Sequence, residues 1–176
     1  GDGYGSLNGS KTETQFGHLN GMAFDSAGNL FVSDQSKIRK ITFAAGSGDA
    51  SSEAFAGNGD WGYVEGAGTE ASFREPAGIV VDASDNILVA DRHNHRIRKI
   101  TQSGEVSTFA GDGHGYQDGS LLSARFESPY GLSIDSSGDI FVSTIDGHRI
   151  RKIDVSENTV STIAGSGSYG FLDSDL

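Results

Sequence analysis

The chain has 176 residues, enough for one hydrophobic core, and its composition limits the class of protein that it can form. Its 26 glycines with only two prolines exclude a collagen-like or proline-rich chain, and a hydrophobic share of 35% is too high for a disordered one. The lack of cysteine excludes disulfides and thiolate metal sites, and a formal net charge of −11 opposes binding to nucleic acid.

The start of the given sequence does not resemble a targeting signal. No stretch is apolar over the length of a membrane span, and the opening residues GDGYGSLNGS have neither the basic nor the apolar region of a signal peptide. The chain also does not begin with methionine. We expect a mature product or a segment of a longer protein.

A repeat governs the whole chain. The tetrapeptide IRKI occurs at residues 38–41, 97–100 and 150–153. Before each copy stands a related segment: GMAFDSAGNLFVSD, GIVVDASDNILVAD and GLSIDSSGDIFVST, beginning at Gly21, Gly78 and Gly131. Repetition at a period of 50 to 60 residues indicates one supersecondary unit per copy.

Each copy predicts four short strands. In chain order, the first copy has strands at 21–25, 30–33, 37–41 and one ending before Gly57; the second at 78–82, 87–90, 96–100 and 106–110; the third at 131–135, 140–143, 149–153 and 160–164. Ile79 and Val81 alternate with Val80, and turn residues such as SAGN and SSGD separate the strands. No helical periodicity interrupts the series, which favours antiparallel sheets.

Four antiparallel strands per repeat are typical of a β-propeller blade, whose two apolar faces only neighbouring blades can cover. The fold prediction is therefore all-β, with three four-stranded blades. The predicted boundaries are residues 1–57, 58–111 and 112–165 for the blades, with 166–176 as the start of a further linker. Since closed propellers need about four to eight blades, we expect completion to about six, within a longer parent chain or by head-to-tail self-association.

The repeat resembles the NHL family of propellers, in a variety with long linkers. The resemblance rests on Gly111, Gly113, Gly115, Tyr116, Asp118, Gly119, Ala124, Phe126, Pro129, Gly131, Asp135, Gly138, Val142 and RIRK at 149–152. It covers nearly the whole chain and implies a propeller, in a family that includes scaffolds, RNA binders and a few metal-binding lyases. The first copy departs from the pattern, because Leu19 replaces the proline and its second loop is shortened to DQSK.

The ligand-binding candidates lie on one predicted face. The loop after the second strand and the linker after the fourth must emerge on the same side of an antiparallel blade, and rigid sheets commonly present binding loops at one end. The candidates there are Trp61, Tyr63, Tyr116, His114, Asp91, His93, His95 and His148. The alternative is that the aromatic residues cover the gaps between blades, since their pattern recurs in each linker.

The basic segment DRHNHRIRKI, residues 91–100, is interpreted as scaffold. His95 and His148 hold equivalent positions before RIRK, and Lys37 holds the third. Arg96, Arg98 and their equivalents are expected to form surface ion pairs with Asp91 and nearby acidic residues, each worth about 0 to 1 kcal/mol.

Metal binding and modification are secondary hypotheses. The candidate ligands for zinc or calcium are His95, His148, Asp112 and Asp118, although neither the HExxH spacing nor a complete calcium loop is present. Asn8 begins the sequon Asn-Gly-Ser and would carry a glycan only on a eukaryotic secretory route.

The sequence predicts a non-catalytic propeller that binds a protein or glycan through its loop face, secreted to the cell surface or envelope and without a required cofactor. One alternative is a metal-assisted lyase or hydrolase of the propeller class. The predicted first strands count against it, because apart from their terminal aspartates they carry small or apolar residues. The other alternative is a subunit of an extracellular filament.

Overall fold

The computed structural model describes residues 8–170, which form short strands and two single-turn 3-10 helices. The strands are β1 (Gly9–Ser10), β2 (Leu19–Phe24), β3 (Leu30–Asp34), β4 (Lys37–Phe43), β5 (Ala50–Ala56), β6 (Pro76–Val81), β7 (Ile87–Asp91), β8 (Arg96–Ile100), β9 (Val106–Ala110), β10 (Gly119–Ser120), β11 (Pro129–Ile134), β12 (Ile140–Thr144), β13 (Arg149–Asp154) and β14 (Thr159–Ala164). The 3-10 helices are η1 (Gly68–Glu70) and η2 (Arg92–Asn94). The all-β prediction is confirmed.

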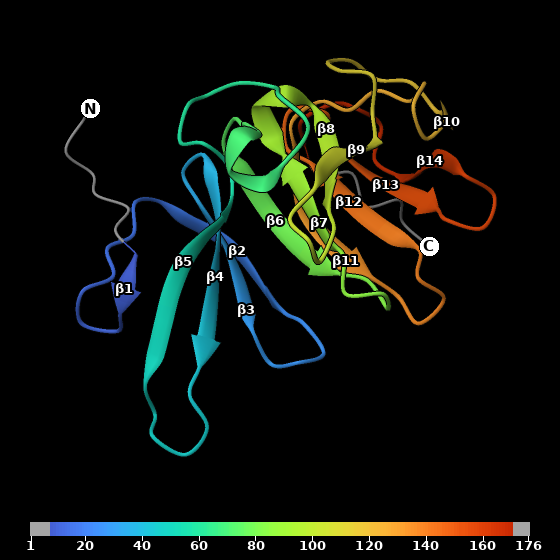
Figure 1. Cartoon of the computed structure of the whole chain (residues 1–176). Coiled ribbons are helices and arrows are strands. Elements are labelled where there is room, and N and C mark those ends of the chain that lie inside the picture. Colours follow the sequence, from blue (N-terminus) through green and yellow to red (C-terminus); the bar gives the residue numbers. More distant parts are fainter. Residues whose placement is uncertain (1–7, 171–176) are drawn as a thin grey trace.

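The strands form three antiparallel sheets, which lie side by side in chain order (Figure 1). We call β2–β5 blade 1, β6–β9 blade 2 and β11–β14 blade 3. Within each blade the strands are ordered as they occur in the sequence. The first strands β2, β6 and β11 contact one another in turn, which places them at the inner edge of the array.

The linkers add strand pairs that the sequence did not predict. β1 pairs with β5, and β10 pairs with β14, so that a short piece of linker extends the outer edge of the blade that follows it. In blade 2 a single bridge between Gly66 and Val106 holds the same place. Pairing at this position protects the edge strand, which would otherwise present unpaired backbone groups.

The core lies between the blades. One cluster joins Phe31, Ile38 and Ala56 of blade 1 to the face of blade 2 that carries Ile79. The other joins the opposite face of blade 2, including Val80, to blade 3. Ile79 and Val80 therefore face different neighbours, as their alternation in the sequence predicts.

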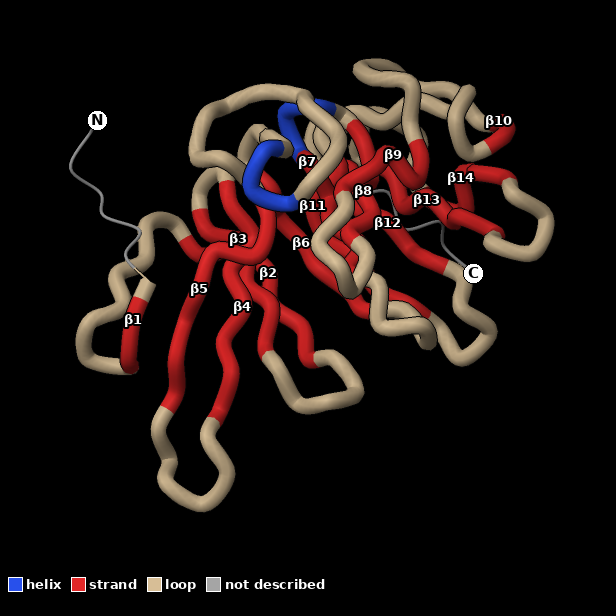
Figure 2. The backbone as a smooth tube through the Cα atoms, in the orientation of Figure 1, coloured by secondary structure: helices blue, strands red, loops and turns tan. Residues whose placement is uncertain are grey.

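The linkers and both 3-10 helices gather at one end of the blades, while the hairpin loops 25–29 and 44–49 lie at the other end (Figure 2). We call the first end the linker face. Within residues 8–170, no helix has the length and hydrophobicity needed to cross a bilayer.

Candidate functional site

The middle arginine of each IRKI copy is buried, not on the surface. Arg98 and its partner Asp91 are both 0% exposed, and their side chains are joined at 3.0 Å. The predicted pair of Arg98 with Asp91 is present, but its predicted place on the surface is wrong. A register shift between Ile97 and Arg98 lets both consecutive residues enter the core, and the guanidinium reaches under the linker to donate to the Val64 carbonyl at 3.0 Å.

The burial of Asp91 removes it from the set of surface candidates. Its carboxylate accepts hydrogen bonds from the Arg74 backbone N–H and the Asn94 amide, each at 2.8 Å, in addition to Arg98. Burial raises the pKa of this carboxyl, and these hydrogen bonds and the arginine charge act in the opposite direction. Asp91 fixes the linker to the blade.

In blades 1 and 3 the equivalent buried arginines pair with aspartates at different positions. Arg39 pairs with Asp34 at 3.4 Å, and both side chains are fully buried. In blade 3 the position of Asp91 is occupied by Thr144, and Arg151 pairs instead at 2.6 Å with Asp118, a linker residue whose side chain is 44% exposed. Three buried arginines thus tie three linkers to three blades.

The linker tyrosines cover these arginines. Tyr63 lies over Arg96 and Arg98, with ring centroids 4.3 and 4.8 Å from the guanidinium carbons. Tyr116 lies over Arg149 at 3.8 Å and over Arg151. These cation–π stacks hold each linker against the blade that follows it.

The histidine candidates form local contacts along the linker face. The rings of His95 and His114 meet edge to face at 4.7 Å, and His148 meets Tyr169 in the same way. His95 Nδ1 accepts the Ser128 backbone N–H at 3.2 Å, which connects blade 2 to the entry of blade 3. Burial, followed by the charges of His114 and His93, lowers the pKa of His95, while Asp146 opposes the shift.

The four metal candidates do not converge. Asp118 is engaged by Arg151, Asp112 pairs with Arg125 at 3.6 Å, and His95 and His148 belong to different blades. Among residues 8–170, no three His, Asp or Glu side chains are grouped so that they could hold a metal ion. Asn8, the sequon residue, is exposed, and its amide oxygen accepts the Ala54 N–H at 3.0 Å.

A cavity of about 900 Å³ opens on the linker face, where the inner ends of the three blades meet. It is lined by Gly17, His18, Leu19, Asn20, Gln35, Ser36, Gly59, Asp60, Trp61, Glu75, Arg92 and Tyr130. Of the eight ligand-face candidates, only Trp61 lines it. The other eleven lining residues were not among the candidates chosen from the sequence.

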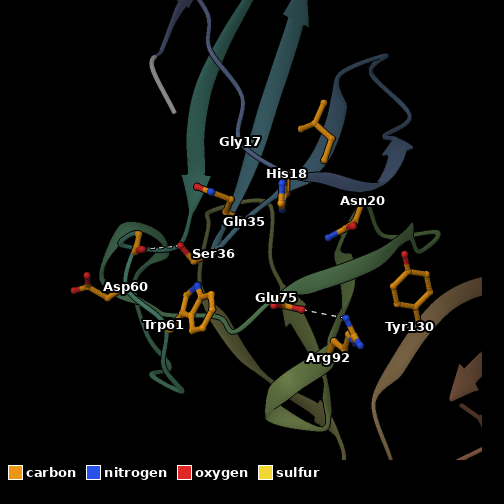
Figure 3. A pocket seen from close by; sticks show the side chains of 12 residues that line it. Gly17, His18, Asn20, Gln35, Ser36, Asp60, Trp61, Glu75, Arg92 and Tyr130 are labelled. Atoms are coloured by element: carbon orange, nitrogen blue, oxygen red, sulfur yellow. Dashed lines mark hydrogen bonds and ion pairs between the residues drawn. The ribbon is translucent and has the colours of Figure 1, made fainter. Parts of the chain in front are cut away.

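In the cavity lining, the Glu75–Arg92 pair lies between the aromatic rings of Trp61 and Tyr130 (Figure 3). Trp61, on the 57–75 linker, is 64% exposed although it is the one tryptophan of the chain. Glu75 pairs with Arg92 at 3.1 Å and with His93 at 3.5 Å, and the Arg92 guanidinium lies 5.9 Å from the Tyr130 ring centre. The arrangement combines an apolar ring surface with several hydrogen-bond donors and acceptors.

Four lining residues occupy equivalent positions in the first two repeats: His18 and Glu75 stand two residues after the linker phenylalanine, and Gln35 and Arg92 stand immediately after the second strand. In the third repeat Ser128 and Ile145 hold these positions and do not line the cavity. The buried arginine and the linker phenylalanine are the same in every copy, whereas these positions differ. Variation between the copies is the signal that could have located the cavity from the sequence.

Residues 73–100, which run from the buried Phe73 through blade 2 to the end of IRKI, match the NHL repeat family. The chain contains an NHL repeat. The NHL repeat-containing protein 2 of Homo sapiens is 35% identical over 97 residues, which are 54% of this chain and 13% of that protein. The chain therefore spans a small part of that relative, and the activity of the whole relative does not transfer with the NHL repeat.

Solved structures agree with an NHL-type propeller fold. An auxiliary nutrient binding protein from Bacteroides thetaiotaomicron superposes with a TM-score of 0.71 at 25% identity, covering 85% of this chain and 38% of that one. A gluconolactonase from Xanthomonas campestris superposes with a TM-score of 0.60 at 15% identity, over 86% of this chain and 48% of that one. The second likeness concerns the fold alone.

Proposed function

We propose that this chain is a non-catalytic binding module that holds a glycan in the cavity of the linker face. The observation that carries the proposal is the exposed Trp61 beside the Glu75–Arg92 pair in a cavity of about 900 Å³. Pockets for small ligands are commonly of this size and place a few polar groups around an apolar surface.

The chemistry of the lining suits a sugar. The indole of Trp61 offers a flat apolar surface for the C–H face of a pyranose ring, and its N–H is a donor. Gln35 and Asn20 have amides that both donate and accept, and the Glu75 carboxylate accepts from hydroxyl groups. The Arg92 guanidinium is paired with Glu75, and Asp60 adds a second carboxylate to the lining, so the cavity favours neutral glycans over acidic ones.

The similar Bacteroides protein is described as an auxiliary nutrient binding protein, which supports a binding role for this fold without defining the ligand. We further propose that the protein acts outside the cell or in the cell envelope. The net charge of −11 and the exposed Trp61 on the linker face support that location. Fractionation of the producing cells, with recovery only in the cytosol, would contradict it.

A glycan array followed by calorimetry tests the function. We expect a neutral oligosaccharide to bind the chain, and Trp61→Ala to weaken binding about tenfold, the effect of losing about 1.4 kcal/mol of stacking. Tyr169→Ala is the matched control, because Tyr169 holds the equivalent linker position, is 86% exposed and does not line the cavity.

Equal affinity of the two variants for the glycan would show that the glycan does not bind in the cavity. Failure of every glycan, together with capture of a protein ligand that depends on Trp61, would replace the glycan with a protein at the same face. Turnover of a lactone or ester by the chain, lost in Glu75→Gln, would overturn the non-catalytic assignment and favour the enzyme alternative.

A further inference from the structure

A second, smaller cavity of about 190 Å³ lies between blades 1 and 2. It is at the end of the blades opposite the linker face, beside the hairpin turns 25–29 and 82–86. Its lining, which shares no residue with the linker-face cavity, consists of Asp25, Ala27, Asn29, Phe31, Lys40, Phe55, Asp85, Ile87 and Gln102. Its walls therefore belong to two consecutive blades.

The two turns beside this cavity are joined by hydrogen bonds that the next pair of blades cannot make. The Asp85 carboxylate accepts the Ser26 hydroxyl at 2.6 Å and the Ser26 N–H at 2.9 Å. Asp85 has a φ of 58°, in the left-handed region where the equivalent residues are Gly28 and Gly138. At the contact of blades 2 and 3, the serine is replaced by Ala83 and the aspartate by Gly138. An aspartate at a position that favours glycine is thus specific to the first contact.

Lys40 enters the cavity wall without an acidic partner. Its equivalent in blade 3, Lys152, pairs with Asp139 at 2.7 Å and with Asp154 at 3.2 Å. In blade 1, Asn29 replaces the first of these aspartates and a threonine replaces the second. Among residues 8–170, Lys40 makes no ion pair. Its positive charge is therefore available to a bound anion.

Two carboxylates on the same cavity are also without a cationic partner. Asp25 accepts the Asn29 N–H at 2.7 Å and the Asn29 amide at 2.8 Å. The hydrogen bonds from the hydroxyl and the N–H of Ser26 lower the pKa of Asp85, so this carboxylate is charged at neutral pH. A carboxylate can accept about four hydrogen bonds, and both aspartates therefore keep capacity for a ligand.

The remaining wall is apolar. Phe31 and Phe55 meet edge to face at 5.0 Å, and the Lys40 ammonium lies 6.0 Å from both ring centres. Ile87 of blade 2 is buried on the other side. The cavity is smaller than the roughly 300 to 1,000 Å³ that drug-sized ligands need, so it has room for one small molecule.

We propose that this cavity binds a free amino acid with an apolar side chain. The α-carboxylate pairs with the Lys40 ammonium, and the α-ammonium donates to the Asp25 and Asp85 carboxylates. The side chain lies against the rings of Phe31 and Phe55. A metal ion would be repelled by the lysine, and a ligand with a second carboxylate would face the two aspartates. This inference does not rest on the proposed glycan site.

Calorimetry on the full 176-residue chain tests the inference with L-leucine and two analogues that each lack one charge. Isocaproate lacks the ammonium, and isoamylamine lacks the carboxylate. We expect saturable binding of leucine and an affinity about tenfold lower for each analogue, because each loses one charge-assisted contact worth about 1.4 kcal/mol. Isocaproate binding as tightly as leucine would overturn the inference, as would the absence of saturable leucine binding.

Substitutions locate the amino acid in this cavity. Lys40→Met removes the ammonium, and Asp85→Gly removes one carboxylate while supplying the glycine of the other two repeats, so each should weaken leucine binding about tenfold. Lys40→Arg keeps the charge and should retain binding. The control is Lys99→Met, which changes the equivalent lysine of blade 2 outside the cavity lining.

Far-UV circular dichroism identifies any variant that has lost its fold. A folded Lys40→Met that binds leucine as the parent does would contradict the assignment. The same conclusion would follow if Lys99→Met weakened binding as much as Lys40→Met, because the loss would then reflect overall charge and not this cavity.

Discussion

Replacing Asp91 with asparagine removes the charge that faces the buried Arg98 guanidinium at 3.0 Å. The shape of the side chain is kept, and one amide oxygen still accepts a hydrogen bond. The guanidinium, however, loses its carboxylate partner at a site that is 0% exposed. A buried charge left without its counterion costs about 3 to 5 kcal/mol.

Asp118 provides the comparison within the same protein. Its carboxylate holds the equivalent arginine, Arg151, from a linker position that is 44% exposed, so water can replace part of what Asp118→Asn removes. We expect this variant to lose less stability than Asp91→Asn, about 1 to 2 kcal/mol, because the pair lies between the buried and the solvent-exposed cases. The two substitutions change the same atoms beside the same kind of arginine and differ mainly in solvent access.

Thermal unfolding at neutral pH, followed by far-UV circular dichroism, measures both. For a chain of this length, about 1 kcal/mol corresponds to about 2 to 4 °C in Tm, so Asp91→Asn should melt about 6 to 20 °C below the parent. If Asp91→Asn lost no more stability than Asp118→Asn, burial of the ion pair would not be what fixes the linkers, and the reasoning would fail.

Two further predictions concern the contact between blades 2 and 3. Because the native pKa of His95 lies below its ordinary value of 6.5, the unfolded chain binds a proton more readily, so stability is fully present above that pH and declines as the pH falls below it. Urea midpoints at pH 7.5 and 5 should therefore differ less in His95→Asn, which tolerates the left-handed backbone (φ 56°) and does not titrate; an unchanged difference would assign the titration elsewhere. Gly111→Ala should destabilise by about 1 to 3 kcal/mol more than Gly138→Ala, because both have positive φ but only at Gly111 would the β-carbon meet the His95 carbonyl and the Phe126 ring, each at 3.0 Å. Equal thermal shifts for the two would contradict that packing.

Much of the fold could be predicted because the same pattern occurs three times. The positions of IRKI and of the turns SAGN and SSGD locate twelve of the strands, since each strand is short, apolar on alternate sides and followed by turn residues. The strands β1 and β10 were missed because each has two residues, Gly and Ser, with no strand preference. Their pairing depends on where the linker is held.

The burial of Arg98 could not be predicted from its position in a charged tetrapeptide. Surface exposure is the usual state of arginine, and the exception requires the register shift after Ile97, the Asp91 carboxylate and the Tyr63 and Phe73 rings together. These groups come from three separate segments. A single segment of sequence does not contain that information.

The cavity was difficult to predict from the sequence for a different reason. Trp61 was identified as the one tryptophan and by its place in a linker, whereas Glu75 was not singled out and Arg92 belongs to the segment 91–100 that was interpreted as scaffold. Their significance follows from the meeting of three blades at one point. Whether the remaining candidates, such as His93 and His148, contribute to binding stays a prediction.

The variable positions two residues after each linker phenylalanine carry a consequence for how such molecules diversify. Blades 1 and 2 contribute different side chains from these positions, His18 and Glu75, to the shared cavity, while the phenylalanine and arginine that hold each blade remain the same. Under the proposed binding function, the identity and order of the blades would therefore set the ligand preference. Exchanging one whole blade for another would change the cavity and leave the cross-links intact, so duplication and shuffling of gene segments can explore new specificities without reinventing the architecture.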